Sequence, residues 1–184
     1  MNRNVRLLCR TALLLALCIA SQFLKNLSVY ITGSIVNAIL ILATLSCCLW
    51  SGAAISVIAP LTSWWITGSP IMSAMPVIVP CIMAGNLILV LAVWLFARRP
   101  GRRLPLRLGC GMIAGSVVKF VFMWGMICQV ILPLLGPGSG LKAPALAAAA
   151  ANFSLPQLLT ALIGSALAFA VWLPLEKYLK KPGV

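Results

Sequence analysis

A single lysine stands inside one of the long apolar stretches of the chain. Lys119 occurs in the sequence GSVVKFVFMW, eleven residues beyond residue 108, where we expect a helix to begin. At the helical rise this is a depth of roughly 16 Å, close to the middle of a lipid bilayer. A lysine there is costly and typical of a functional site, and the alternative is a side chain that extends to the inner surface. We expect Lys119 to pair with a carboxylate or another anionic group of a ligand.

The chain itself offers Lys119 almost no anionic partner. It has no aspartate and no histidine, and its one carboxylate, Glu176, stands beside Lys177 near the C-terminus. Carboxylate pairs, Ser-His-Asp arrangements and metal-ligand clusters are therefore excluded, and no Walker-type phosphate loop occurs. We expect neither an enzyme nor a metal site nor a cofactor, and the missing carboxylates also argue against proton-coupled transport.

Other polar and aromatic side chains could share a cavity with this lysine. In membrane helices such residues also hydrogen-bond to neighbouring helices, so each has a structural alternative. Gln129 lies ten residues beyond Lys119, so in an α-helix the two side chains would point within about 80° of each other around the helix axis. The candidates for ligand contact beside Lys119 are Asn37, Asn86, Gln129, Asn152, Gln157 and Thr160, with Trp124 and Tyr30 placed to stack on or cap a ring.

The elements that must position these residues are membrane-spanning helices. Of the 184 residues, 62% are hydrophobic and only 8% are charged, which is far from the composition of a soluble domain. A hydrocarbon core of roughly 30 Å takes about 20 helical residues. We predict one all-α domain, residues 1–184, that forms a compact bundle of six transmembrane helices over residues 5–24, 33–50, 53–67, 76–97, 108–133 and 153–175.

The basic residues predict how this bundle is oriented. Eleven of the 14 lysines and arginines fall in three groups that flank apolar spans: before the first span, in the loop 98–107, and at the C-terminus. Under the positive-inside rule these groups are cytoplasmic, so both termini lie inside the cell. The net charge of +13 therefore reflects the orientation of the protein in the membrane, and we do not expect nucleic-acid binding. We expect a tight inner turn at Trp50-Ser51-Gly52, a short third span, and a first span that is retained rather than cleaved as a signal peptide.

The first span carries a regular row of small residues. Ala12, Ala16 and Ala20 recur at every fourth position and share one face of a helix. Such a face lets another helix approach closely. The partner could be a helix of the same chain, or a second protein that docks on this one.

With these features the chain resembles the substrate-binding S component of energy-coupling factor (ECF) vitamin transporters. The resemblance covers nearly the whole chain, and it is carried by the alanine row and by the segments YITGSIVNAILILAT, PVIVPCIMAGNLILV with Asn86, and FSLPQLLTALIGSALA. It implies a multi-pass protein of a prokaryotic cell membrane that captures a vitamin-like small molecule from outside. A transmembrane T component and two ATPases would supply the energy, and the alanine face of the first helix would dock on the T component.

The resemblance leaves the substrate open. Metal-specific relatives use a histidine near the N-terminus, which this chain lacks, so a metal substrate is not expected. Lys119 favours an acid such as pantothenate, niacin, lipoate, biotin or a folate-like molecule, while flavin, pyridoxine and corrinoid ligands remain open. Two other functions compete: an MreD-like scaffold of the cell envelope, which needs no polar cavity, and an autonomous facilitator, which needs no ATPase.

Overall fold

The computed structural model describes residues 2–26, 28–98 and 104–179, which are mostly helical with short connecting loops and contain no strand. Six helical segments of this part of the chain are long and apolar enough to cross a membrane, which confirms the predicted fold class. The elements in chain order are α1 (Arg3–Gln22), η1 (Phe23–Asn26), α2 (Val29–Ser46), α3 (Leu49–Thr67), α4 (Pro70–Ala74), α5 (Ile78–Arg98), α6 (Leu104–Met123), η2 (Trp124–Ile131), α7 (Leu132–Leu135), α8 (Ala143–Asn152) and α9 (Leu155–Leu179).

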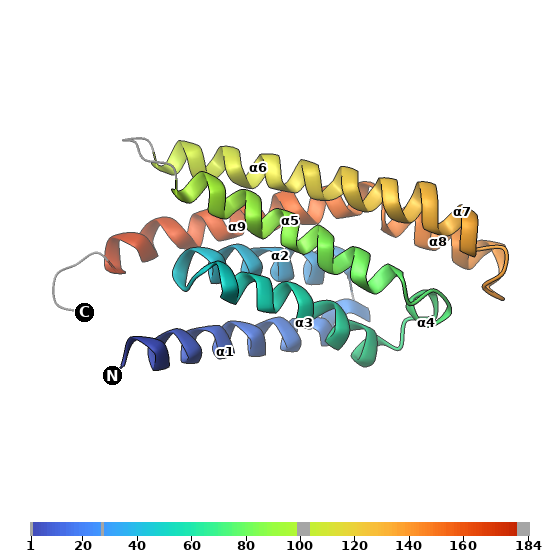
Figure 1. The fold of residues 1–184 in the computed structure, drawn as a ribbon, viewed down its shortest axis with the longest axis horizontal. Helices are drawn as coiled ribbons and strands as arrows, with labels where there is room; N and C mark the ends of the chain where they lie inside the picture. Colours follow the sequence, from blue (N-terminus) through green and yellow to red (C-terminus); the bar gives the residue numbers. More distant parts are fainter. Residues whose placement is uncertain (1, 27, 99–103, 180–184) are drawn as a thin grey trace.

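The long helices run roughly side by side, and the two ends of the chain lie at the same end of the bundle (Figure 1). We call this the terminal end; α4, α7 and α8 lie at the opposite end, which we call the capped end. Both termini lie at the same end because the chain runs along the bundle an even number of times, once in each of its six long spans. Which end faces the cytoplasm stays a prediction from the basic residues, and of these Arg99, Arg102, Arg103, Lys180 and Lys181 lie outside the described ranges.

Helix α2 is the centre of the bundle, because it packs against α1, α3, α5 and α9. Towards the terminal end its side chains meet those of the neighbouring helices in a buried apolar cluster that includes Ile41, Leu89, Val93 and Met112. Helix α1 is peripheral and packs mainly on α2 and α3. Most of its surface is therefore open to lipid or to a partner.

The predicted helix boundaries need three corrections. The chain turns at Cys47 and Cys48 rather than at Trp50-Ser51-Gly52, and α3 begins at Leu49. Gly52 lies inside α3, where a Cβ atom would collide with the side chain of Thr44 on α2, so this glycine serves close packing rather than a turn. The third span has 19 residues and is not short. It ends at Gly68, whose φ of +53° is the left-handed conformation that glycine adopts most readily.

Two loops at the capped end contain helices that the apolar pattern did not predict. Helix α4 begins at Pro70, where the missing N–H is not needed, and α8 is an alanine-rich segment of 10 residues. Both are too short to span a membrane, and they contact each other across the capped end. Both helices contribute residues to the cavity between the long helices.

Candidate functional site

Lys119 lies at the middle of its span. The continuous apolar segment Pro105–Leu135 has 31 residues, and Lys119 is the fifteenth when counted from Pro105. Its side chain is only 3% exposed, and its Nζ atom donates hydrogen bonds to Asn37 Oδ1 at 2.6 Å and to Asn86 Oδ1 at 2.7 Å. The amine is thus held inside the bundle by two amide groups and does not extend to the surface.

Asn37 is positioned by an unusually close approach of α2 and α9. Gly164 of α9 faces Asn37, and a Cβ atom at Gly164 would lie 2.6 Å from the Asn37 Cβ and 2.6 Å from the Ser34 carbonyl oxygen. Small residues at a helix crossing permit this kind of backbone contact in membrane proteins. The Asn37 side chain is fixed further by its Nδ2, which donates to the Gly33 carbonyl at 2.9 Å.

Asn86 reaches Lys119 through a second close contact, between α5 and α6. Gly85 precedes it, and a Cβ atom there would lie 2.7 Å from the Met123 Cγ and 3.7 Å from the Lys119 Cγ. The absence of a side chain at this position lets α5 press against the face of α6 that carries Lys119. Two glycines on different helices therefore bring the two amides to one amine.

The lysine fixes the direction of both amide groups. An ammonium group has three donors and no acceptor, so each asparagine must present its oxygen to Lys119 and its NH₂ group elsewhere. Two of the three ammonium donors are used, and the structure gives Asn86 Nδ2 no hydrogen-bond partner among the described residues. This cluster consequently offers a ligand a set of N–H donors. We call Lys119, Asn37 and Asn86 the donor cluster.

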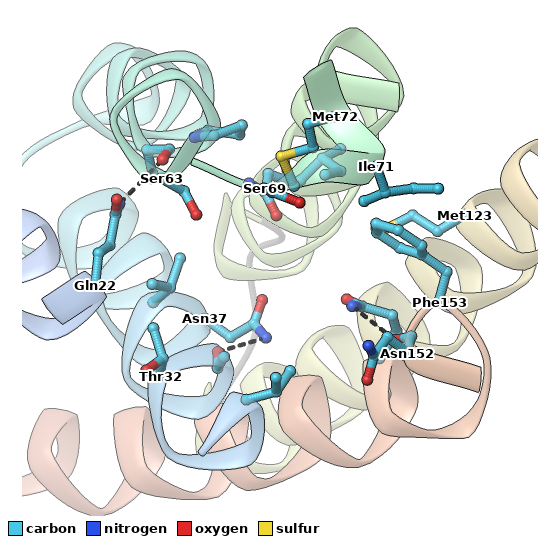
Figure 2. A pocket seen from close by; sticks show the side chains of 18 of the residues that line it. Gln22, Thr32, Asn37, Ser63, Ser69, Ile71, Met72, Met123, Asn152 and Phe153 are labelled. Atoms are coloured by element: carbon cyan, nitrogen blue, oxygen red, sulfur yellow. Dashed lines mark hydrogen bonds between the residues drawn. The ribbon is translucent and has the colours of Figure 1, made fainter. Parts of the chain in front are cut away.

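The donor cluster lines a cavity of about 190 Å³ in the half of the bundle nearer the capped end. A cavity of roughly 150 Å³ accepts a benzene-sized molecule, so this one has room for a small ring or a short chain. Figure 2 shows Gln22 and Thr32 on one side of the cavity and Met123 and Phe153 on the other. The remaining lining residues are Val29, Gly33, Val36, Ala59, Pro60, Ser63, Ser69, Ile71, Met72, Ile82, Ala149, Asn152 and Gln157.

Four of the eight uncharged candidates line the cavity. Asn37 and Asn86 belong to the donor cluster, while Asn152 and Gln157 lie near the capped end. Gln157 Nε2 donates to the Asn152 carbonyl oxygen at 3.2 Å, which links the end of α8 to the start of α9. These two side chains border the cavity where α9 begins.

The other four candidates do not line the cavity. Thr160 is buried where α9 crosses α2, close to Gly33, and its hydroxyl donates to the Gln157 carbonyl. Tyr30 and Trp124 are 48% and 40% exposed. Gln129 is exposed as well and lies in η2, a π-helical segment. A π turn contains an additional residue and rotates the residues after it by about 100°, so the α-helical count from Lys119 does not apply there.

Several cavity residues carried no clear signal in the sequence. Gln22 stands at the end of an apolar run that has the pattern of an ordinary lipid-facing span, and a polar residue at a span end is common. Ser69, Met72 and Ala149 come from segments that were expected to be loops. Phe153 is 7% exposed and closes the cavity beside the end of α8, which no periodicity indicated.

The alanine row lies on an open face of the molecule. Ala12, Ala16 and Ala20 are all exposed, and only 11% of the α1 span is buried. The inward side of α1 instead carries Cys18 and Gln22, which are buried. Within the described residues, therefore, the row does not serve packing against another helix of the same chain.

A bundle of six membrane-spanning helices around a small, mainly apolar cavity with a few polar groups defines a membrane protein that can bind a small molecule. The family model of the ECF transporter substrate-specific component matches residues 6–176, nearly the whole chain. The chain therefore belongs to the ECF transporter substrate-specific components, a family of transporter subunits and not of enzymes. Searches of curated proteins and of solved structures found no significant match.

Membership in this family states the role of the chain in general terms. It is a multi-pass membrane protein and the substrate-specific subunit of an ECF transporter. The family implies a small-molecule substrate and association with a T component and ATPases.

Proposed function

We propose that this subunit captures a small micronutrient that carries a carboxylate, and that the acid binds at the donor cluster. The observation that carries the proposal is the buried amine of Lys119, which has two amide partners and, among the described residues, no carboxylate partner. A cation in the membrane interior is costly unless an anion compensates it. A carboxylate of the ligand supplies that anion and accepts the donors that remain on Lys119 and Asn86.

The ligand enters from the capped end in this proposal, and the capped end faces the outside of a prokaryotic cell. The cavity lies in that half of the bundle, while the basic groups flank the terminal end. Helix α1 then docks through Ala12, Ala16 and Ala20 on the T component, with its two ATPases. The exposed, unpartnered alanine face supports this assignment. Binding and docking use different parts of the molecule.

The test is native mass spectrometry of the protein purified from cells grown in rich medium. We expect the wild type to retain a small acid, and Lys119→Ala to lose it, because no other cation lines the cavity among the described residues. Gln129→Ala is the matched control, since it removes a polar side chain of the same span outside the cavity. A wild type that retains nothing and ignores a panel of vitamins would favour the scaffold function, and a retained acid that survives Lys119→Ala would contradict the assigned site.

A further inference from the structure

Gln22 carries a polar atom that has no hydrogen-bond partner among the described residues. Its side chain is 2% exposed, it lies at the end of α1, and it lines the cavity (Figure 2). Its Nε2 donates to the Ala59 carbonyl oxygen at 3.0 Å and to the Thr62 hydroxyl at 3.1 Å. Since a carbonyl oxygen only accepts, the contact with Ala59 fixes which end of the amide is nitrogen.

The opposite end of this amide is therefore an oxygen acceptor, and it is unsatisfied. Gln22 Oε1 is buried and has no hydrogen-bond partner among the described residues. The Thr62 hydroxyl accepts from Gln22 Nε2, and its own proton has two acceptors at 3.1 Å, the carbonyl oxygens of Ile58 and Ala59. Buried acceptors in native proteins are nearly always satisfied, and an unsatisfied one is costly. Because Gln22 lines the cavity, a group inside the cavity can supply this missing partner.

We propose that Gln22 Oε1 accepts a hydrogen bond from an N–H or O–H group of the bound acid. The inference rests on the proposed function and narrows the substrate class to small carboxylic acids that also carry a hydrogen-bond donor. The two polar regions of the cavity then have opposite character. The donor cluster offers N–H groups to the carboxylate, and Gln22 offers an acceptor to a different part of the same molecule.

These opposite polar regions should make the cavity selective. An acid without a donor leaves Gln22 Oε1 unsatisfied in the complex, whereas an acid with a suitably placed donor satisfies it. From the typical contribution of one hydrogen bond, we expect a difference of roughly fivefold to tenfold in Kd.

The experiment uses pairs of probes that differ only in this donor. N-acetylglycine, N-acetyl-β-alanine and N-acetyl-4-aminobutyrate place an amide N–H one, two and three carbons from the carboxylate. In 4-oxopentanoate, 5-oxohexanoate and 6-oxoheptanoate a methylene replaces that N–H at otherwise equal length. Each Kd is measured by calorimetry on the purified full chain in detergent micelles. We expect the amide to bind more tightly than its ketone counterpart at one of the three lengths.

Two variants assign that preference to Gln22. Gln22→Met keeps the size of the side chain and removes the acceptor, so the ratio between the Kd values of ketone and amide should fall to about one. Thr62→Val removes a partner of Gln22 Nε2, leaves Oε1 in place, and lies outside the cavity lining, so the preference should persist. The comparison on the wild type does not depend on the folding of any variant.

The possible failures are distinguishable. Equal binding of amide and ketone at every length overturns the role of Gln22 but leaves the acid site intact. A preference that survives Gln22→Met also overturns it. If neither member of any pair binds the wild type, the proposed acid site is itself wrong, and the inference falls with it.

Discussion

The amine of Lys119 is the central group of the candidate site, and its two hydrogen-bond partners are uncharged. Asn37 and Asn86 are amides, which orient and hydrogen-bond the amine but do not neutralise it. An aspartate at either position would satisfy the charge within the protein. Among the described residues, therefore, no acidic side chain compensates a charge on Lys119, and in the proposed function the bound acid does so.

If one amide is replaced by a carboxylate, the amine of Lys119 should pair with the protein instead of with a ligand. In Asn86→Asp the carboxylate takes the 2.7 Å contact with Lys119, so the amine acquires a permanent counter-ion and the cavity loses N–H donors. We expect the affinity for the retained acid to fall by about tenfold or more while the protein stays folded. Calorimetry and thermal unfolding of the purified protein measure the two quantities.

Gly138→Asp is the control for this substitution. It adds the same charge at an exposed position of the loop between α7 and α8, outside the cavity lining, and should leave the affinity unchanged. Full affinity in Asn86→Asp would show that Lys119 does not bind the acid.

At the scale of the helices, the site depends on how closely two pairs of elements approach each other. Helices α2 and α9 meet at Gly164, and helices α5 and α6 meet at Gly85. Each crossing brings one amide of the donor cluster to the interior. The glycines contribute no chemistry, but the distances at the amine depend on the absence of their side chains.

A methyl group at the first crossing should therefore disturb both stability and binding. In Gly164→Ala the new Cβ would lie 2.6 Å from Asn37 Cβ and from the Ser34 carbonyl oxygen, which is rigid backbone. We expect the free energy of unfolding to fall by about 1–3 kcal/mol, the usual cost of overpacking, together with weaker acid binding because Asn37 moves. Thermal unfolding in detergent and calorimetry provide the measurements.

Gly109→Ala is a matched control in another long helix. A Cβ atom at Gly109 meets nothing within 4 Å, so the higher helix propensity of alanine should stabilise the protein or leave it unchanged. If Gly109→Ala and Gly164→Ala changed the stability and the acid affinity equally, the close crossing at Gly164 would be contradicted.

At the scale of the whole molecule, the cavity and the exposed alanine face of α1 occupy separate regions. The cavity lies between α2, α3, α5, α6 and the two short helices of the capped end, whereas the alanine face lies on the outside of the peripheral α1. Helix α1 contributes to both, through Gln22 at its end and the alanine row along its outer face. A substitution on that outer face can therefore separate binding from transport.

Enlarging the alanine face should abolish transport without affecting the subunit itself. Ala16→Leu adds bulk to an exposed position, so we expect unchanged acid binding and thermal stability, but loss of co-purification with the T component and loss of uptake. Cells that express this chain with a T component and its ATPases allow both measurements.

The control is Ala166→Leu, the same change at an exposed position of α9. It should retain co-purification and uptake. Wild-type complex formation by Ala16→Leu would show that docking uses another surface.

The order of residues along the chain was enough to predict the class of fold and the central residue of the site. Six apolar stretches and one all-helical bundle followed from composition and length, because a lipid core admits few other ways to satisfy the backbone. Lys119 stood out for a related reason: a charged residue in an apolar span is costly, so its presence needs an explanation. Asn37 and Asn86 belonged to the same argument, since each is an amide inside an apolar run.

Which polar residues meet, and which do not, depends instead on the folded chain. Gln129 has the spacing of a neighbour of Lys119, but the π segment between them turns it outward. Gln22 had no local feature that marked it, yet the packing of α1 on α3 buries its amide and leaves one atom unsatisfied. Helices α4 and α8 line part of the cavity although their residues carry no span-like pattern. The physical reason is common to all three: apolar length is a property of one segment, whereas the facing of a side chain depends on how the helices cross.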